Sequence, residues 1–406
     1  MNLRLIKVLL TVVCLTATMH AFGQGPLNEG PWRALIRLND TTSLPFNFTV
    51  FSDHLEIINA DEKIIVDEIK YSGDSVFIKL PVFDTEIRCQ MGENLLDGQF
   101  INHSRPTNNI LKFRAESGID WRFSSQPEPT THDISGRWHV IWDKEDGENK
   151  SSVAIFNQKE NHLTGTFLTN SGDYRFLEGE VSGSNVSLSG FDASHAYLFN
   201  AVILFDGSLN GNFYSGVHWH DTWTGWKNDA VQLTDPESLT FLKPGYDRLA
   251  FTFPDENGKR ISLTDPEYLN KIIVVQIMGT WCSNCLDETK YLVELYERYP
   301  KDKFKIIALD YERISDSEYA FKNIKRLKER LNIQYPIVYA GSSKREEAAK
   351  SLPMLSRIAS YPTTIVIDKK GVVRKIHTGF NGPATGDEYE KFTNDFSGFI
   401  EKLLVE

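Results

Sequence analysis

The chain has 406 residues and a formal net charge of −11 at pH 7. This acidic balance argues against nucleic acid as a partner and, more weakly, against an anionic membrane surface. The length predicts two or three domains, and a hydrophobic content of 41% is sufficient for packed cores.

Residues 1–23 have the pattern of a secretion signal peptide. Two basic residues precede an apolar stretch over residues 8–17, and small residues follow at the cleavage spacing. A lipid anchor at Cys14 is an alternative, although Val13 is not the small residue that such processing prefers. We expect an exported protein of the periplasm or cell envelope, with no membrane span after signal removal.

Residues 27–234 are predicted to form an all-β region, because short alternating runs are separated by Gly, Asn and Asp. Its halves, about 27–126 and 134–234, open on the similar triplets Gly30-Pro-Trp32 and Gly136-Arg-Trp138. The repeat predicts duplication of one β-unit. The pattern fits two small barrels or sandwiches, and it also fits one large barrel.

Two histidines stand out in residues 216–226. His218 and His220 alternate onto one strand face and, with Asp221, form a possible metal site, but no clear further ligand accompanies them. Ordinary strand residues are the preferred interpretation. The tryptophans of this segment favour a core or a barrel mouth, and an aromatic-lined ligand pocket is the alternative.

Residues 235–248 contain Pro and Gly and are predicted to link the β-region to a C-terminal α/β domain over residues 249–406. Apolar runs and periodicity predict its elements. Strands are expected at 272–278, 304–309, 336–339, 365–367 and 372–377. Helices are expected at 315–331, at 344–358 with an interruption at Pro353, and at 388–404.

Cys282 and Cys285 follow the first of these strands, where the chain turns into a helix. The unpaired N–H groups and partial positive charge of a helix N-terminus favour a thiolate. Such settings lower a cysteine pKa from ~8.5 to roughly 3.5–7.5. We assign Cys282 as the attacking nucleophile and Cys285 as the resolving thiol.

Glu288 lies three residues after Cys285 and is expected on the same helix face. A carboxylate there can take the proton from Cys285 when a mixed disulfide is resolved. The alternative is an ordinary acid of the first helical turn, which favours the helix dipole.

Zinc binding is disfavoured because no second CxxC or histidine pair accompanies the motif. An inert structural bridge is disfavoured because such bridges usually close longer loops. We expect no metal and no cofactor other than the redox-active disulfide itself. Cys89, in an alternating strand, is interpreted as a small buried hydrophobe.

The motif Trp281-Cys-Ser-Asn-Cys285 with Glu288, followed by Tyr361-Pro-Thr-Thr364 before a strand, resembles TlpA/ResA-type thiol–disulfide oxidoreductases, which have a thioredoxin-like fold. The resemblance covers about residues 249–406 and rests on several landmarks in the right order.

This resemblance implies catalytic roles for Cys282, Cys285, Glu288 and Pro362, with Pro362 as a cis-proline beside the disulfide. It also implies substrate contacts from Trp281, Tyr361 and Thr363, protein disulfides as substrates, and a membrane thiol electron donor.

The sequence departs from the family pattern at three positions. Asn284 and Lys290 stand where many members carry proline, which leaves the redox potential and the helix kink open. Gln276 occupies the strand position where thioredoxin has a buried acid, so Glu288 is the better candidate for handling a proton.

Two functions follow from these patterns. The first is an extracytoplasmic thiol–disulfide oxidoreductase, with reduction of protein disulfides favoured. The second is a ligand- or protein-binding β-domain with an auxiliary redox module. A thiol peroxidase shares the fold but requires a Thr, Pro and Arg setting around its cysteine that this sequence lacks.

Overall fold

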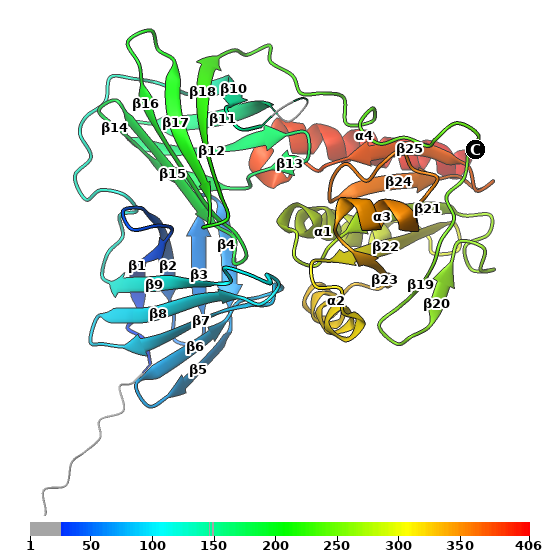
Figure 1. Cartoon of the computed structure of the whole chain (residues 1–406), viewed down its shortest axis with the longest axis horizontal. Coiled ribbons are helices and arrows are strands. Elements are labelled where there is room, and N and C mark those ends of the chain that lie inside the picture. Colours follow the sequence, from blue (N-terminus) through cyan, green and yellow to red (C-terminus); the bar gives the residue numbers. More distant parts are fainter. Residues whose placement is uncertain (1–25, 146, 148–149) are drawn as a thin grey trace, which may run out of the picture.

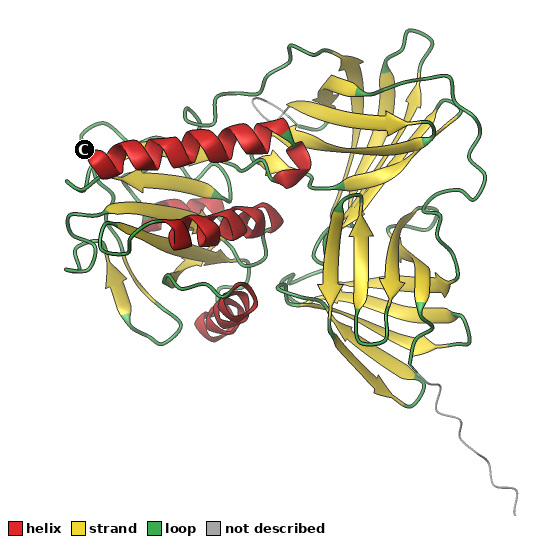
Figure 2. Cartoon of the chain, turned by 180° about the vertical axis from the view of Figure 1, so that it is seen from behind, coloured by secondary structure: helices red, strands yellow, loops and turns green. Residues whose placement is uncertain are grey.

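The computed structural model describes residues 26–145, 147 and 150–406. The signal peptide predicted over residues 1–23, including Cys14, lies outside the described residues. An all-β N-terminal region lies beside an α/β C-terminal domain, which confirms the predicted fold class (Figures 1 and 2). Among the described residues, no helix is long and apolar enough to cross a membrane.

The N-terminal region contains two separate nine-stranded antiparallel sheets, not one large barrel. The first consists of β1 (Gly30–Arg37), β2 (Ser43–Val50), β3 (Leu55–Asn59), β4 (Glu62–Val66), β5 (Glu68–Ser72), β6 (Ser75–Lys79), β7 (Thr85–Met91), β8 (Leu95–Asn102) and β9 (Ile110–Ser117). The second consists of β10 (Gly136–Trp142), β11 (Ser151–Lys159), β12 (His162–Thr169), β13 (Gly172–Asp173), β14 (Leu177–Ser182), β15 (Asn185–Phe191), β16 (Ala196–Ile203), β17 (Leu209–Ser215) and β18 (Trp219–Lys227). Pairing of β11 with β12 closes the second sheet on itself.

The two units repeat one local structure where each begins. The glycines that open β1 and β10, Gly30 and Gly136, have φ of 104° and 109°, a conformation that glycine adopts without strain. The indole N–H of Trp32 donates to the carbonyl four residues earlier at 2.8 Å, and that of Trp138 does the same at 2.7 Å. In both units the first strand pairs with the second and the last. These matches support duplication of one unit.

The C-terminal domain is built on a five-stranded mixed sheet in the order β23-β22-β21-β24-β25. Its strands are β21 (Ile272–Met278), β22 (Phe304–Glu312), β23 (Ile337–Ser342), β24 (Thr363–Ile367) and β25 (Val373–Thr378), preceded by the β19 (Thr252–Pro254) and β20 (Arg260–Ser262) hairpin. The helices are α1 (Ser283–Arg298), α2 (Ser317–Leu331), α3 (Arg345–Ser351) and α4 (Asp387–Val405), with a short 3₁₀ turn, η2 (Pro383–Thr385). The central strand β21 is rich in β-branched residues and is buried along its whole length. The arrangement is thioredoxin-like.

The interruption predicted at Pro353 is confirmed, because α3 ends at Ser351, but no helix resumes over residues 354–358. Pro353 cannot continue a helix, and the following chain extends so that Leu355 pairs with Leu242 of the preceding linker segment. The linker is therefore packed against the C-terminal domain: the Lys243 N–H donates to the Met354 carbonyl at 2.9 Å.

The β-region contacts the C-terminal domain where α1 begins (Figure 1). Arg175, between β13 and β14, donates to the Ser283 carbonyl at 3.0 Å and pairs with Asp287 at 2.7 Å. Asn284 donates to the Asp173 carboxylate at 2.7 Å. The chain approaches so closely here that a Cβ on Gly172 would lie 2.9 Å from the Asn284 side chain.

Replacement of Arg175 by Met tests this contact. The Arg175 and Asp287 side chains are 4% and 5% exposed, and Arg175 also pairs with Glu62 of the first unit. Loss of one partner from a buried ion pair costs about 3–5 kcal/mol, so we expect a lower urea midpoint. We also expect faster alkylation of the reduced Cys282 by iodoacetamide, because the β-region separates from α1.

The matched control is Arg114→Met. Arg114 pairs with Glu116 on the exposed face of β9, where both side chains are about half exposed, and an exposed pair contributes about 0–1 kcal/mol. Unchanged alkylation and an unchanged midpoint in Arg175→Met would contradict the interface described above.

Candidate active site

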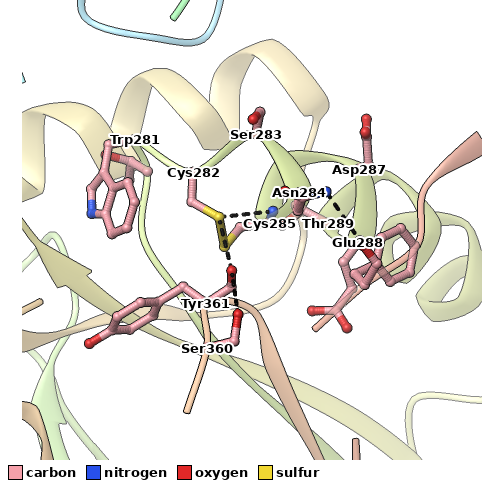
Figure 3. Close-up of a disulfide and its surroundings, with 12 residues drawn as sticks. Trp281, Cys282, Ser283, Asn284, Cys285, Asp287, Glu288, Thr289, Ser360 and Tyr361 are labelled. Atoms are coloured by element: carbon pink, nitrogen blue, oxygen red, sulfur yellow. Dashed lines mark hydrogen bonds between the residues drawn. A yellow bond between two sulfur atoms is a disulfide. The ribbon is translucent and has the colours of Figure 1, made fainter. Parts of the chain in front are cut away.

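Cys282 and Cys285 form a disulfide at the start of α1, with their Cα atoms 5.2 Å apart. Cys282 is the N-cap residue of the helix, and its Sγ accepts the backbone N–H of Cys285 at 3.2 Å (Figure 3). Cys282 is 6% exposed and Cys285 is fully buried. The sulfur of Cys282 is thus the outer one, and it lies within the partial positive charge of the helix terminus.

The loop before β24 lies against the same sulfur. The Tyr361 carbonyl oxygen lies 3.4 Å from Cys282 Sγ, and the Tyr361–Pro362 peptide bond is cis (Figure 3). The rings of Trp281 and Tyr361 meet edge to face at 5.7 Å. Thr363 is fully buried, and its hydroxyl donates to the Ser360 carbonyl. Its side chain therefore stabilises the loop and is not exposed for the predicted contact with a substrate.

Glu288 lies in the second turn of α1, because the helix begins at Ser283 and has no acid in its first turn. The alternative interpretation of Glu288 as a first-turn acid is therefore wrong. Its carboxylate is 1% exposed and accepts hydrogen bonds from Gln276 at 2.9 Å and Thr364 at 2.5 Å. Burial raises the Glu288 pKa to about 7, and the two hydrogen bonds oppose this rise.

Gln276 connects this carboxylate to the redox motif. Its amide nitrogen donates both to Glu288 and, at 3.3 Å, to the Cys285 carbonyl. Its amide oxygen accepts from the Thr289 hydroxyl at 3.1 Å. Gln276 stands in the central strand where thioredoxin has a buried acid. Its hydrogen bonds thus hold Glu288 beside the segment that carries Cys285.

The β-region covers the motif through both residues between the cysteines. His195 Nδ1 lies 3.3 Å from Ser283 Oγ and 3.2 Å from Asp192. On the other side of the disulfide, Ser360 donates to the Ser171 carbonyl at 3.0 Å. Sequence reasoning missed these contacts. The polar Asn284, where many family members carry proline, did not by itself indicate a partner in the β-region.

The contacts between the β-region and the redox motif include several buried charged side chains. Burial opposes the charge of Arg175, but the carboxylates of Asp287, Glu62 and Asp192 outweigh it and raise the Arg175 pKa. Burial and the neighbouring Asp287 raise the Asp173 pKa to about 6. The interface is therefore held by ion pairs and charged hydrogen bonds in a setting of low solvent access.

His220 and Cys89 take no part in the disulfide chemistry. The His220 ring stacks on Tyr214 at 4.4 Å and its Nε2 lies 3.0 Å from Asn212 Oδ1. Within residues 26–145, 147 and 150–406, no three His, Cys, Asp or Glu side chains are grouped to hold a metal ion. Cys89 is buried, and burial raises its pKa to about 12, so it does not ionise near neutrality.

A family model described as the AhpC/TSA family matches residues 244–376. Two thiol-disulfide oxidoreductases named ResA are similar in sequence. The protein from Geobacillus thermodenitrificans is 33% identical over 129 residues, which are 32% of this chain and 66% of that protein. The protein from Bacillus cereus is 32% identical over 154 residues, which are 38% of this chain and 74% of that protein.

Among solved structures, a thiol:disulfide interchange protein of the thioredoxin family from Chlorobium tepidum is 21% identical, with a TM-score of 0.29, and the match covers 39% of this chain and 95% of that chain. The family model spans both cysteines, and the ResA proteins are similar to the C-terminal part of the chain. The chain therefore belongs to the ResA family of thiol-disulfide oxidoreductases.

Proposed function

We propose that the protein is an extracytoplasmic reductase of protein disulfides that uses Cys282 and Cys285 as its redox pair. The observation that carries this proposal is the position of Cys282 Sγ. It accepts the Cys285 N–H at the helix terminus and lies beside the Tyr361 carbonyl of the cis-proline loop. A substrate disulfide that pairs with the backbone at Tyr361 is thereby presented to the sulfur.

The reaction has two exchange steps. The reduced Cys282 thiolate attacks one sulfur of a substrate disulfide, forms a mixed disulfide and releases the other substrate sulfur as a thiolate. Cys285 then loses its proton and attacks Cys282 Sγ, which releases the second substrate thiolate. The substrate gains two electrons, and the Cys282–Cys285 pair is left as the disulfide that the structure contains.

Glu288 is suited to accept the proton of Cys285 in the second step. A pKa of about 7 leaves it partly ionised near neutrality, which suits a general base. The hydrogen bonds from Gln276 and Thr364 fix the carboxylate on the inner side of α1, the side on which Cys285 is buried.

The proposed direction of the reaction and the extracytoplasmic location of the protein are supported by arguments other than the geometry of the site. The predicted signal peptide indicates export to a compartment where disulfides form, and a membrane thiol carrier is the expected source of electrons. As a reductant, the pair should stay largely oxidised in a glutathione buffer poised at about −200 mV, whereas a strongly oxidising pair is reduced there. Alkylation of the equilibrated protein followed by mass spectrometry measures this ratio.

The first prediction concerns the division of roles between the two cysteines. With reduced Cys285→Ser and insulin as the disulfide substrate, we expect a stable mixed disulfide through Cys282, visible on a non-reducing gel. Cys282→Ser should form none, because the remaining thiol is fully buried. Cys89→Ala is the control and should turn over insulin like the wild type. A mixed disulfide carried by Cys285 would reverse the assignment.

The second prediction concerns Glu288. A mixed disulfide of Cys282 with thionitrobenzoate releases a coloured thiolate when Cys285 attacks, so the resolving step can be followed directly. In the wild type its rate should fall as the pH drops through about 7, because the Glu288 carboxylate becomes protonated. Glu288→Gln should slow the step about 10²-fold and remove that pH dependence.

Glu294→Gln is the matched control for this prediction, because Glu294 lies on the exposed face of the same helix. It should keep both the rate and the pH profile of the wild type. An unchanged profile in Glu288→Gln would remove the proposed role as proton acceptor.

A further inference from the structure

A cation that the exchange mechanism does not use lies beside the nucleophile. Arg313 follows β22, and its guanidinium carbon lies 4.0 Å from the ring centroid of Trp281, the residue before Cys282. Its Nη1 is buried and has no hydrogen-bond partner. Stacking on the indole satisfies the face of the guanidinium but leaves this in-plane donor unused.

The β-region contributes further basic groups beside the redox motif. Arg105 from the β8–β9 loop, His195 from the β15–β16 loop and His218 from the β17–β18 turn line one small cavity. His195 also contacts Ser283, which lies between the two cysteines. Three parts of the chain, the two β-units and the C-terminal domain, thus direct basic side chains toward the redox motif.

These charges act on one another. Burial and the charge of Arg105 lower the Arg313 pKa to about 10. Burial lowers the His195 pKa, and the charges of Arg313 and Arg105 add to this effect, although Asp192 opposes it. Both imidazoles are therefore poor sites for further positive charge. The positive charge here is carried by Arg105, which lines the cavity, and by Arg313, on which the charge of Arg105 acts.

No acidic side chain among the described residues forms a salt bridge with either arginine. Asp192 already accepts the N–H groups of Ser194 and His195 and lies 3.2 Å from the His195 ring. Arg175, in contrast, is compensated by Asp287 and Glu62. Glu312 acts on Arg313 and Asp192 acts on Arg105 from a distance, but burial outweighs both and the pKa of each arginine is lowered. Two partly buried, mutually repelling cations without a salt-bridge partner are costly, and a bound anion offsets that cost.

We propose that Arg105 and Arg313 form a binding site for a carboxylate of the disulfide substrate. This inference rests on the proposed function and names the class of substrate: disulfides with an acidic group close to the reacting sulfur. The guanidinium of Arg313 is held rigidly on Trp281, so its free donor is oriented before the substrate arrives. A carboxylate bound there places its own chain beside Cys282, the neighbour of Trp281.

Three small disulfides of different charge test the proposal on the full chain, with dithiothreitol as the electron source. They are 3,3′-dithiodipropionate, which is anionic, 2-hydroxyethyl disulfide, which is neutral, and cystamine, which is cationic. We expect the wild-type kcat/KM to decrease in that order. Arg313→Gln and Arg105→Gln should each lower the ratio of anionic to neutral kcat/KM about tenfold, which is the range of one charged hydrogen bond.

Two further variants complete the design. Arg313→Lys retains the charge and should recover part of the ratio, and a melting curve shows whether each variant is folded. Arg37→Gln removes an exposed arginine at the end of β1, whose guanidinium donates to Ser43, and should leave the ratio unchanged. Added salt should reduce the anionic preference of the wild type, because the contact is electrostatic.

Two results would overturn the proposal. If the ratio of anionic to neutral kcat/KM is unchanged in folded Arg105→Gln and Arg313→Gln, neither residue binds the negative charge of the substrate. An equal loss on all three disulfides would show that the arginines act on Cys282 itself. Failure of the wild type to turn over any of the three, or insulin, would instead count against the proposed function.

Discussion

The backbone N–H of Cys285 that points at Cys282 Sγ is the contact on which the redox chemistry depends. It exists because a fully buried strand, β21, ends directly before α1 and fixes where the helix begins. The helix terminus then supplies a donor and a partial charge at the position where negative charge develops on sulfur. The cis-proline loop and Glu288 are arranged around this one contact, on its outer and inner sides.

The β-region is tied to this contact directly. Its second unit supplies Asp173, Arg175 and His195, which hold the residues between the cysteines, and its first unit supplies Glu62 and Arg105. A β-domain with an independent binding role does not need its buried charges at the redox motif. The contacts therefore favour a β-region that serves the redox site, and they weigh against an auxiliary redox module.

The sequence was sufficient for the parts of the site that are local in the chain. A strand, a CxxC pair and a helix follow one another within a short segment, and Tyr361-Pro362 precedes a strand, so periodicity and spacing identify both. The repeated Gly-x-Trp triplets likewise indicated two β-units. Periodicity and spacing could not predict which turn of α1 contains Glu288, because the first residue of a helix depends on its cap geometry.

The cover over the cysteines was not predictable from the sequence. Asp173, Arg175 and His195 lie more than 80 positions before the motif, and polar residues in strand connections are ordinarily solvated. Only the packing of the two regions shows that these side chains are buried. The same holds for Arg105 and Arg313, which come from different domains and whose charges act on one another.

The packed linker between the β-region and the C-terminal domain affects how a substrate reaches the redox motif that the β-region covers. Because both surfaces belong to one polypeptide, the β-region competes for the redox motif at an effective concentration on the order of millimolar or higher. An incoming disulfide must outcompete this tethered neighbour to reach Cys282, a residue that is only 6% exposed. This competition is intramolecular, so it excludes weakly binding thiol oxidants at any protein concentration. Disulfides are therefore selected by how well they bind, before any sulfur reacts.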